Sequence, residues 1–122
     1  MILGISYPIP QSLEKLYYRC EPLENFVFKY PEIQHLCAFH NVKELYLIGS
    51  AARGQFKEGD DLDFIIDFLT DEHSERNEKF VSFKISLMEI LNQDIDLYDV
   101  KYLTEDLIKK GDTTRILLYQ KS

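Results

Sequence analysis

The spacing of hydrophobic residues changes several times along the chain, and each change marks a predicted helix or strand. Apolar residues recur at helical spacing (i, i+3, i+4, i+7) over residues 12–20, 23–30, 31–40, 74–92 and 104–110. Short apolar runs, or alternation of apolar and polar residues, predict strands over residues 45–48, 61–68, 95–100 and 116–119. Helices that alternate with strands predict an α/β (α+β) fold, with helices packed on a small β-sheet.

The longest predicted helix, over residues 74–92, has a wider apolar face than a surface helix needs for its own core. One stripe includes Phe83 and Leu87, and a second stripe beside it includes Val81 and Ile85. The charged run over residues 71–79 predicts a solvated loop followed by the start of this helix.

Composition is typical of a soluble single-domain protein. The chain has 122 residues, of which 45% are hydrophobic and 29% charged, enough for one core without disulfides. Its two cysteines, Cys20 and Cys37, lack metal-binding spacing, and we expect both to lie in helix faces. Since neither a signal-peptide pattern nor a run of ~20 apolar residues is found, we expect a cytoplasmic protein that does not bind membranes.

The charge balance narrows the choice of partners. Lys and Arg number 14 against 21 Asp and Glu, giving a formal net charge of −7. Affinity for a phosphate backbone comes from Lys and Arg, so this excess of carboxylates argues against direct nucleic-acid binding. It suits a protein partner with a basic surface instead.

Three aspartates form the candidate reactive site. Asp61 and Asp63 are i and i+2 on one predicted strand, so their side chains leave the same face roughly 6–7 Å apart. Two such carboxylates repel each other, and the pKa of one rises unless a hard cation such as Mg²⁺ lies between them. Asp96, on another predicted strand, completes a three-carboxylate site if the strands are neighbours. Asp94, on the same face of that strand, is its rival.

A phosphate site is predicted just upstream of these aspartates. The apolar run over residues 45–48 ends at Gly49 and Ser50, where the chain enters a polar segment that we expect to form a helical turn and a loop. Exposed backbone N–H groups and a small hydroxyl there can hold a phosphate, and glycine lets the backbone approach closely. A phosphate site beside a carboxylate metal site is what phosphoryl or nucleotidyl transfer requires.

Residues 47–54 (LIGSAARG), followed by residues 61–64 (DLDF), resemble the signature of the minimal nucleotidyltransferases (MNT) of the DNA polymerase β superfamily. Residues 95–97 (IDL) resemble the strand that carries the third aspartate of that family. The resemblance divides the single domain, residues 1–122, into an N-terminal helical extension (1–41) and a catalytic core (42–119).

The resemblance implies a mixed sheet flanked by helices. It also implies transfer of a nucleoside monophosphate from a nucleoside triphosphate to a hydroxyl group, with Mg²⁺ bound as two ions. Gly49 and Ser50 would hold the triphosphate, and Asp96 would help to deprotonate the attacking hydroxyl. Arg53 would either contact phosphate or brace the loop through a salt bridge. The implied metal ligands are Asp61, Asp63 and Asp96.

Two features depart from the family pattern. Asp60 stands where the family often has serine, and its extra charge would either help to hold the metal or face water; we expect the latter. The extension over residues 1–41 is longer than the leading helix of many minimal members. It is an added layer, a partner-docking element or the mark of a variant subfamily.

Minimal members of the family are often antitoxins encoded beside a helical HEPN toxin, and some transfer AMP from ATP to a tyrosine of that toxin. The resemblance therefore favours a protein adenylyltransferase antitoxin with a HEPN-type toxin as its partner. An antitoxin or regulatory module of the same fold that acts by occlusion alone, and a small-molecule nucleotidyltransferase, are the alternatives. The presence of all three carboxylates favours an enzyme, and the wide face of the helix at 74–92 suits burial, a homo-oligomer or a hetero-oligomer.

Overall fold

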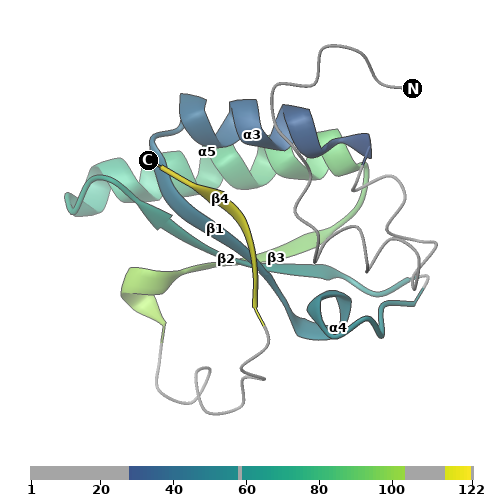
Figure 1. Cartoon of the computed structure of the whole chain (residues 1–122). Helices are drawn as coiled ribbons and strands as arrows, with labels where there is room; N and C mark the ends of the chain where they lie inside the picture. Colours follow the sequence, from purple (N-terminus) through teal and green to yellow (C-terminus); the bar gives the residue numbers. More distant parts are fainter. Residues whose placement is uncertain (1–27, 58, 104–114, 122) are drawn as a thin grey trace.

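The computed structural model describes residues 28–57, 59–103 and 115–121 of the chain. Helices in this part are α3 (Tyr30–Phe39), α4 (Gly49–Ala52), α5 (His73–Leu91) and the 3₁₀ helix η2 (Val100–Tyr102). The strands are β1 (Val42–Ile48), β2 (Leu62–Phe68), β3 (Ile95–Asp99) and β4 (Ile116–Gln120). Helices α3 and α5 lie together on one face of the sheet, and α4 lies at the end of β1 (Figure 1). This small mixed sheet with its helices confirms the predicted fold class.

The strands lie in the order β3-β2-β1-β4. Strand β1 pairs antiparallel with β2 and with β4, whereas β2 and β3 are parallel. A parallel pair needs a crossover connection, and α5 provides it between β2 and β3. The N-terminal ends of β2 and β3 therefore lie side by side, next to the C-terminal end of β1.

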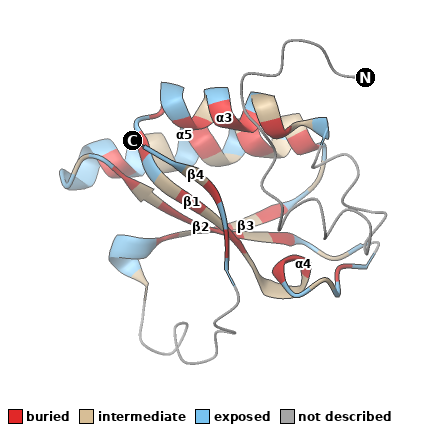
Figure 2. Cartoon of the chain, viewed as in Figure 1, coloured by how far each residue is buried: buried red, intermediate tan, exposed pale blue. Residues whose placement is uncertain are grey.

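The core lies between the two long helices and the sheet (Figure 2). Alternate residues of the strands point into it, because successive side chains of a strand leave opposite faces. The buried residues of α3, β2 and α5 include Ile33, Cys37, Leu62, Phe64, Ile66, Phe83, Leu87 and Leu91. Tyr30 and Gln34 of α3 both donate hydrogen bonds to the carbonyl oxygen of Leu118, at 2.9 and 2.6 Å. These two bonds fasten α3 to β4.

The predicted elements agree with the observed ones where the structure describes them. The predictions over 31–40, 61–68, 74–92, 95–100 and 116–119 are each confirmed to within one residue at either end. Strand β1 begins three residues before the predicted run, because the register extends from Tyr46 through the polar Glu44 to Val42. The helices predicted over 12–20, 23–30 and 104–110, and Cys20, lie wholly or mostly outside the described residues.

Two residues of the second apolar stripe of α5 lie outside the core, whereas the third, Met88, packs against it. Val81 and Ile85 are 56% and 53% exposed, whereas Phe83 and Leu87 of the first stripe are fully buried. The apolar face of this helix is therefore wider than its own domain uses.

One residue corrects the expectation that the charged run 71–79 is solvated. Arg76 is only 1% exposed. Its guanidinium donates to both carboxylate oxygens of Asp99 and, at 3.0 Å, to Asp67. It also donates to the carbonyl oxygens of Phe68 and Thr70, at 3.3 and 2.8 Å. Arg76 thus ties the first turns of α5 to the C-terminal ends of β2 and β3.

We expect Arg76→Met to lower the free energy of unfolding by about 3–5 kcal/mol, because it leaves the buried Asp99 without a counter-charge. Adding Asp99→Asn should recover part of this loss, since the uncompensated charge is then removed. Urea unfolding followed by circular dichroism measures both effects, with Lys79→Met in the same helix as the control. A loss below about 1 kcal/mol for Arg76→Met, the size typical of a surface ion pair, would contradict this account.

Candidate active site

Asp63 of β2 and Asp96 of β3 lie opposite each other in the parallel pair. Both residues are half-buried, and their carboxyl groups are close enough to form a hydrogen bond with each other. Two carboxyl groups can share such a bond only when one of them holds a proton. The pair is therefore stable with a shared proton, or with a cation in its place.

The surroundings of Asp63 disfavour its charged form. Burial raises the pKa of Asp63 to about 6, and the hydrogen bond and charge of Asp96 and the charge of Asp61 act in the same direction. The positive charge of Arg53 opposes them. A carboxyl group with a raised pKa next to a second carboxyl group is a feature of many functional sites.

Asp61 does not join this pair in the structure. It precedes β2 and is exposed, and no three His, Cys, Asp or Glu side chains among the described residues are grouped as a metal site. The predicted three-carboxylate cluster is thus present as the pair Asp63 and Asp96, with Asp61 acting on it through its charge. Asp94, the rival of Asp96, is exposed and precedes β3.

Gly49 lies against Asp63. It follows Ile48, the last residue of β1, which is opposite Asp63 in the antiparallel pair. Its φ of +72° falls in the left-handed region that glycine adopts without strain. A Cβ atom at this position would collide with the Asp63 carboxylate. The backbone conformation and the close approach of the chain to Asp63 therefore both favour glycine at this position.

Ser50 and Arg53 lie on and just after α4, the short turn that begins at Gly49. Ser50 is half-buried, and its carbonyl oxygen accepts a hydrogen bond from the amide of Gln55 at 2.8 Å. Arg53 is exposed, and its Nε donates to Oε1 of Gln55 at 3.1 Å. Arg53 is therefore hydrogen-bonded within the loop after α4, and its charge acts to lower the pKa of Asp63. Its two predicted roles, a phosphate contact and a salt bridge that braces the loop, stay predictions.

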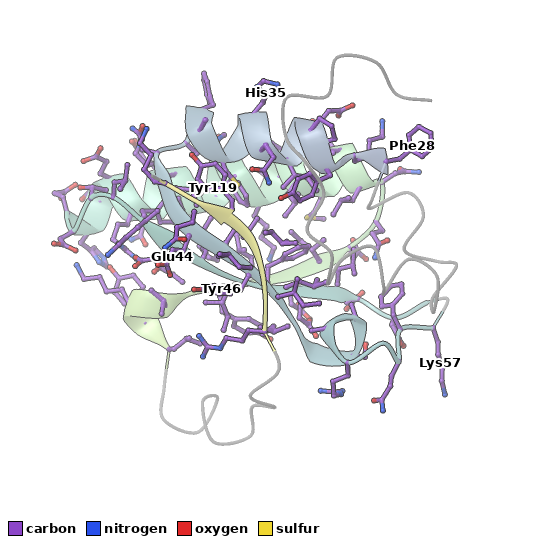
Figure 3. All side chains as sticks on the ribbon, viewed as in Figure 1. Phe28, His35, Glu44, Tyr46, Lys57 and Tyr119 are labelled. Carbon is purple, nitrogen blue, oxygen red and sulfur yellow. The ribbon has the colours of Figure 1, made fainter. Side chains whose placement is uncertain are left out.

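Asp60 closes a turn in the loop before β2. Its carboxylate accepts a hydrogen bond from the amide of Lys57 at 2.9 Å, and its own amide donates to the carbonyl oxygen of Lys57 at 3.0 Å. The Lys57 side chain extends away from this loop (Figure 3). The structure thus gives Asp60 a local role in the turn, which neither of the two expected roles included.

A row of residues that was not singled out from the sequence lies beside the carboxyl pair. Tyr46, Ile65 and Tyr98 are opposite one another across β1, β2 and β3. They are two residues along the strands from the row that contains Asp63 and Asp96, so they share its face of the sheet. Figure 3 shows Tyr46 on the side of the sheet away from α3 and α5.

The donor set of this site fits a hard divalent cation. Mg²⁺ takes oxygen ligands, and it commonly binds one or two carboxylates together with substrate phosphates. Asp63 and Asp96 offer two facing carboxyl groups whose mutual repulsion such a cation would remove. The arrangement fits Mg²⁺ bound together with a phosphate better than a metal enclosed by protein ligands alone.

Residues 31–122 match the family model described as "Polymerase beta, Nucleotidyltransferase". The chain belongs to this family of nucleotidyltransferases. No match was found among curated proteins. In the part of the chain that the structure describes, no helix combines the length and the hydrophobicity needed to cross a membrane.

Solved structures share the fold at low sequence identity. A protein assigned as a minimal nucleotidyltransferase has a TM-score of 0.64 and 24% identity, over 77% of this chain and 93% of that one. A toxin–antitoxin structure with AMP-PNP has a TM-score of 0.61 and 20% identity, over 75% of this chain and 73% of that one. The structure of a tri-AMPylated Shewanella oneidensis HEPN toxin in complex with MNT antitoxin has a TM-score of 0.56 and 19% identity, over 77% of this chain and 71% of that one.

Replacement of Gly49 by alanine should lower the free energy of unfolding more than the same replacement of Gly59, which serves as a matched control. Gly59 also has a positive φ, of +93°, but no atom lies within 4 Å of the position its Cβ would take. We expect Gly59→Ala to lower the free energy of unfolding by about 1–2 kcal/mol through backbone strain alone. Gly49→Ala should cost about 1–3 kcal/mol more, because its methyl group displaces Asp63. Equal losses in urea unfolding would show that the close approach to Asp63 is not tight.

Asp63→Asn should stabilise the metal-free protein at neutral pH. The pKa of Asp63 is raised from 3.8 to about 6 by folding, so the native state loses stability as the pH rises from about 4 to 6. Asparagine carries no ionisable group, so Asp63→Asn does not lose stability in this way as the pH rises. In EDTA at pH 7.5 we expect it to be more stable by about 1 kcal/mol, after allowance for solvent screening of a half-buried group.

Thermal unfolding of both proteins between pH 4 and pH 8 measures this effect. The difference in stability between Asp63→Asn and the native protein should be absent near pH 4 and should reach its full size above pH 6. A variant that is less stable than the native protein at pH 7.5 would show that the Asp63 carboxylate is favourably paired without metal.

Proposed function

We propose that this chain is a Mg²⁺-dependent protein adenylyltransferase that acts as an antitoxin. It would transfer AMP from ATP to a tyrosine hydroxyl of a HEPN-type toxin in the cytoplasm. The observation that carries the proposal is the pairing of Asp63 and Asp96 across two parallel strands, with the Gly49 turn in contact with Asp63. Membership of the polymerase β nucleotidyltransferase family supports the reaction class.

The proposal gives each site residue a role. Asp61, Asp63 and Asp96 would hold the metal, and Gly49, Ser50 and Arg53 would hold the triphosphate. Bound Mg²⁺ supplies positive charge that offsets the charge on the phosphates and on the departing pyrophosphate.

The proposed reaction is an in-line displacement at the α-phosphorus of ATP. The acceptor oxygen forms a bond to that phosphorus while the bond to the bridging oxygen of pyrophosphate breaks. Asp96 accepts the proton of the hydroxyl, a role helped by its position on β3, the edge strand of the sheet. In the proposed reaction, an acceptor on the surface of another protein approaches this edge of the described sheet.

Two of the similar structures support the choice of donor and partner. One is a toxin–antitoxin structure with AMP-PNP, and another pairs an AMPylated HEPN toxin with its MNT antitoxin. ATP as donor and a HEPN-type toxin as acceptor are the corresponding choices for this chain.

A second candidate function is neutralisation by occlusion alone. The exposed apolar residues of α5, Val81 and Ile85, favour it, because they offer a docking surface on the opposite face of the sheet from the carboxyl pair. Binding through such a surface would need none of the aspartates of the site.

A label-transfer assay separates the two functions. The chain is incubated with α-labelled ATP, Mg²⁺ and lysate of its own host, with Asp96→Asn and Asp94→Asn in parallel. We expect a discrete labelled protein that Asp96→Asn abolishes, a loss of at least about 100-fold, because the hydroxyl loses its proton acceptor and the metal loses a ligand. Asp94 is exposed and lies two residues before Asp96, so the Asp94→Asn variant should label the same protein as strongly as the native chain does.

Unchanged labelling by Asp96→Asn would contradict the proposed role of the pair. If labelling is absent throughout and Asp96→Asn still neutralises the partner, the chain acts by occlusion.

A further inference from the structure

A shallow hollow, which we call the α5 hollow, runs along the side of α5 that faces away from the core. Helix α5 covers the face of the sheet opposite to the carboxyl pair, so the α5 hollow is separate from the candidate active site (Figure 1). The residues that line it recur at intervals of three and four along the helix and therefore share one side of it. They include Glu78, Val81, Ser82, Ile85, Ser86 and Glu89.

The centre of the α5 hollow is apolar. Val81 and Ile85 are one turn apart, and more than half of each side chain is exposed. The serines that follow them, Ser82 and Ser86, have short side chains and leave room beside the two apolar ones. An apolar stripe of this kind on one side of a helix suits contact with the apolar side of another helix.

Phe39 extends the apolar surface towards the end of α3. Its side chain is 81% exposed, and its ring meets the ring of His40 edge-on, with 5.2 Å between the centroids. Nε2 of His40 is hydrogen-bonded to the hydroxyl group of Ser82 at 2.9 Å. This chain of contacts links Phe39 to the serine side of the α5 hollow. The exposed apolar residues here come from two helices, so they form more than the scattered single residues of an ordinary surface.

A carboxylate stands at each end of the apolar centre. Glu78 and Glu89 are both exposed, and they lie three helical turns apart, about 16 Å along α5. Neither forms an ion pair with a basic side chain in the part of the chain that the structure describes. Two such carboxylates attract a partner that carries Lys or Arg at matching positions.

The same charges disfavour a second copy of this chain as the occupant. If two copies paired their α5 helices antiparallel through this surface, Glu78 of each copy would lie opposite Glu89 of the other. If the helices paired in parallel, each glutamate would lie opposite its own equivalent. Like charges that face each other across an interface weaken it, and each copy has a formal net charge of −7. The charges therefore favour a different, basic partner.

We propose that the α5 hollow docks an amphipathic helix of a partner protein, with an apolar stripe that has a Lys or Arg at each end. The stripe packs on Val81 and Ile85, and the basic side chains pair with Glu78 and Glu89. This inference goes beyond the proposed function. Docking at α5 leaves the carboxyl pair on the other face free, so it holds the partner whether or not AMP is transferred.

Two designed helical peptides test the proposal. The basic peptide has leucines along one side and a lysine at each end of this stripe, three turns apart. The acidic peptide is identical except that glutamates replace both lysines. Fluorescence anisotropy gives the dissociation constant of each labelled peptide with the full chain. We expect the native chain to bind the basic peptide at least about tenfold more tightly than the acidic one.

Variants show whether this preference arises at the α5 hollow. Glu78→Lys combined with Glu89→Lys should reverse it. Glu32→Lys combined with Asp94→Lys changes the net charge equally at exposed positions outside the hollow, and should leave the native preference. Ile85→Ser should weaken binding of the basic peptide by about tenfold, because apolar contact is lost. Circular dichroism confirms that each variant is folded.

Equal binding of the two peptides to the native chain, or a preference that the Glu78→Lys and Glu89→Lys pair does not reverse, would overturn the proposal. A native chain that does not bind the basic peptide at about 1 mM would also overturn it, as expected if another part of the chain covers the hollow. Sedimentation velocity tests the second copy: a native dimer that Ile85→Ser dissociates would overturn the proposal, whereas monomers in both cases agree with it. None of these measurements involves nucleotide, so each of these failures would leave the proposed transfer intact.

Discussion

The parallel register of β2 and β3 is the constraint on which the site depends. It places the carboxyl groups of Asp63 and Asp96 side by side, an arrangement that costs free energy unless a proton or a cation lies between them. A shift of one residue in this register would turn one of the two side chains to the opposite face of the sheet. The chain thus maintains a local repulsion where its chemistry would take place, a pattern expected at functional sites.

The groups that hold this register lie away from the repulsion. The aspartates at the N-terminal ends of β2 and β3 face each other, whereas Asp67 and Asp99, near the C-terminal ends, share the buried Arg76. Arg76 belongs to α5, the crossover that makes the parallel pairing possible. At the site itself, Gly49 lets the end of β1 approach Asp63. The attraction between Arg76 and the two aspartates at the C-terminal ends of β2 and β3 therefore helps to hold the strands in the register that brings Asp63 and Asp96 together at the N-terminal ends. The row of Tyr46, Ile65 and Tyr98, which lies between these two groups, carries no charge.

Local periodicity was enough to predict most elements of the described fold. It left Asp94 as the rival of Asp96, so the choice of Asp96 as the partner of Asp63 rested on the resemblance of residues 95–97 (IDL) to the third-aspartate strand of the family. Strand alternation also places Tyr98 on the same face as Asp96, so its nearness to the pair could have been inferred. The roles of Arg76 and Asp60 could not be predicted in this way. The burial of Arg76 depends on two strand ends that are distant in sequence. Asp60 takes part in a turn that local periodicity does not specify. The separation of Asp61 from the pair likewise depends on where β2 begins.

Binding of Mn²⁺, a spectroscopic substitute for Mg²⁺, tests the central claim most directly. Electron paramagnetic resonance would count bound Mn²⁺ in the presence of a non-hydrolysable ATP analogue at pH 7.5, for the native chain, Asp63→Asn and Asp94→Asn. If Asp63 and Asp96 form the cation site, the native chain and Asp94→Asn bind Mn²⁺ alike, and Asp63→Asn binds at least about tenfold more weakly. Equal Mn²⁺ affinity in the native chain and Asp63→Asn would show that the paired carboxyl groups are not a metal site.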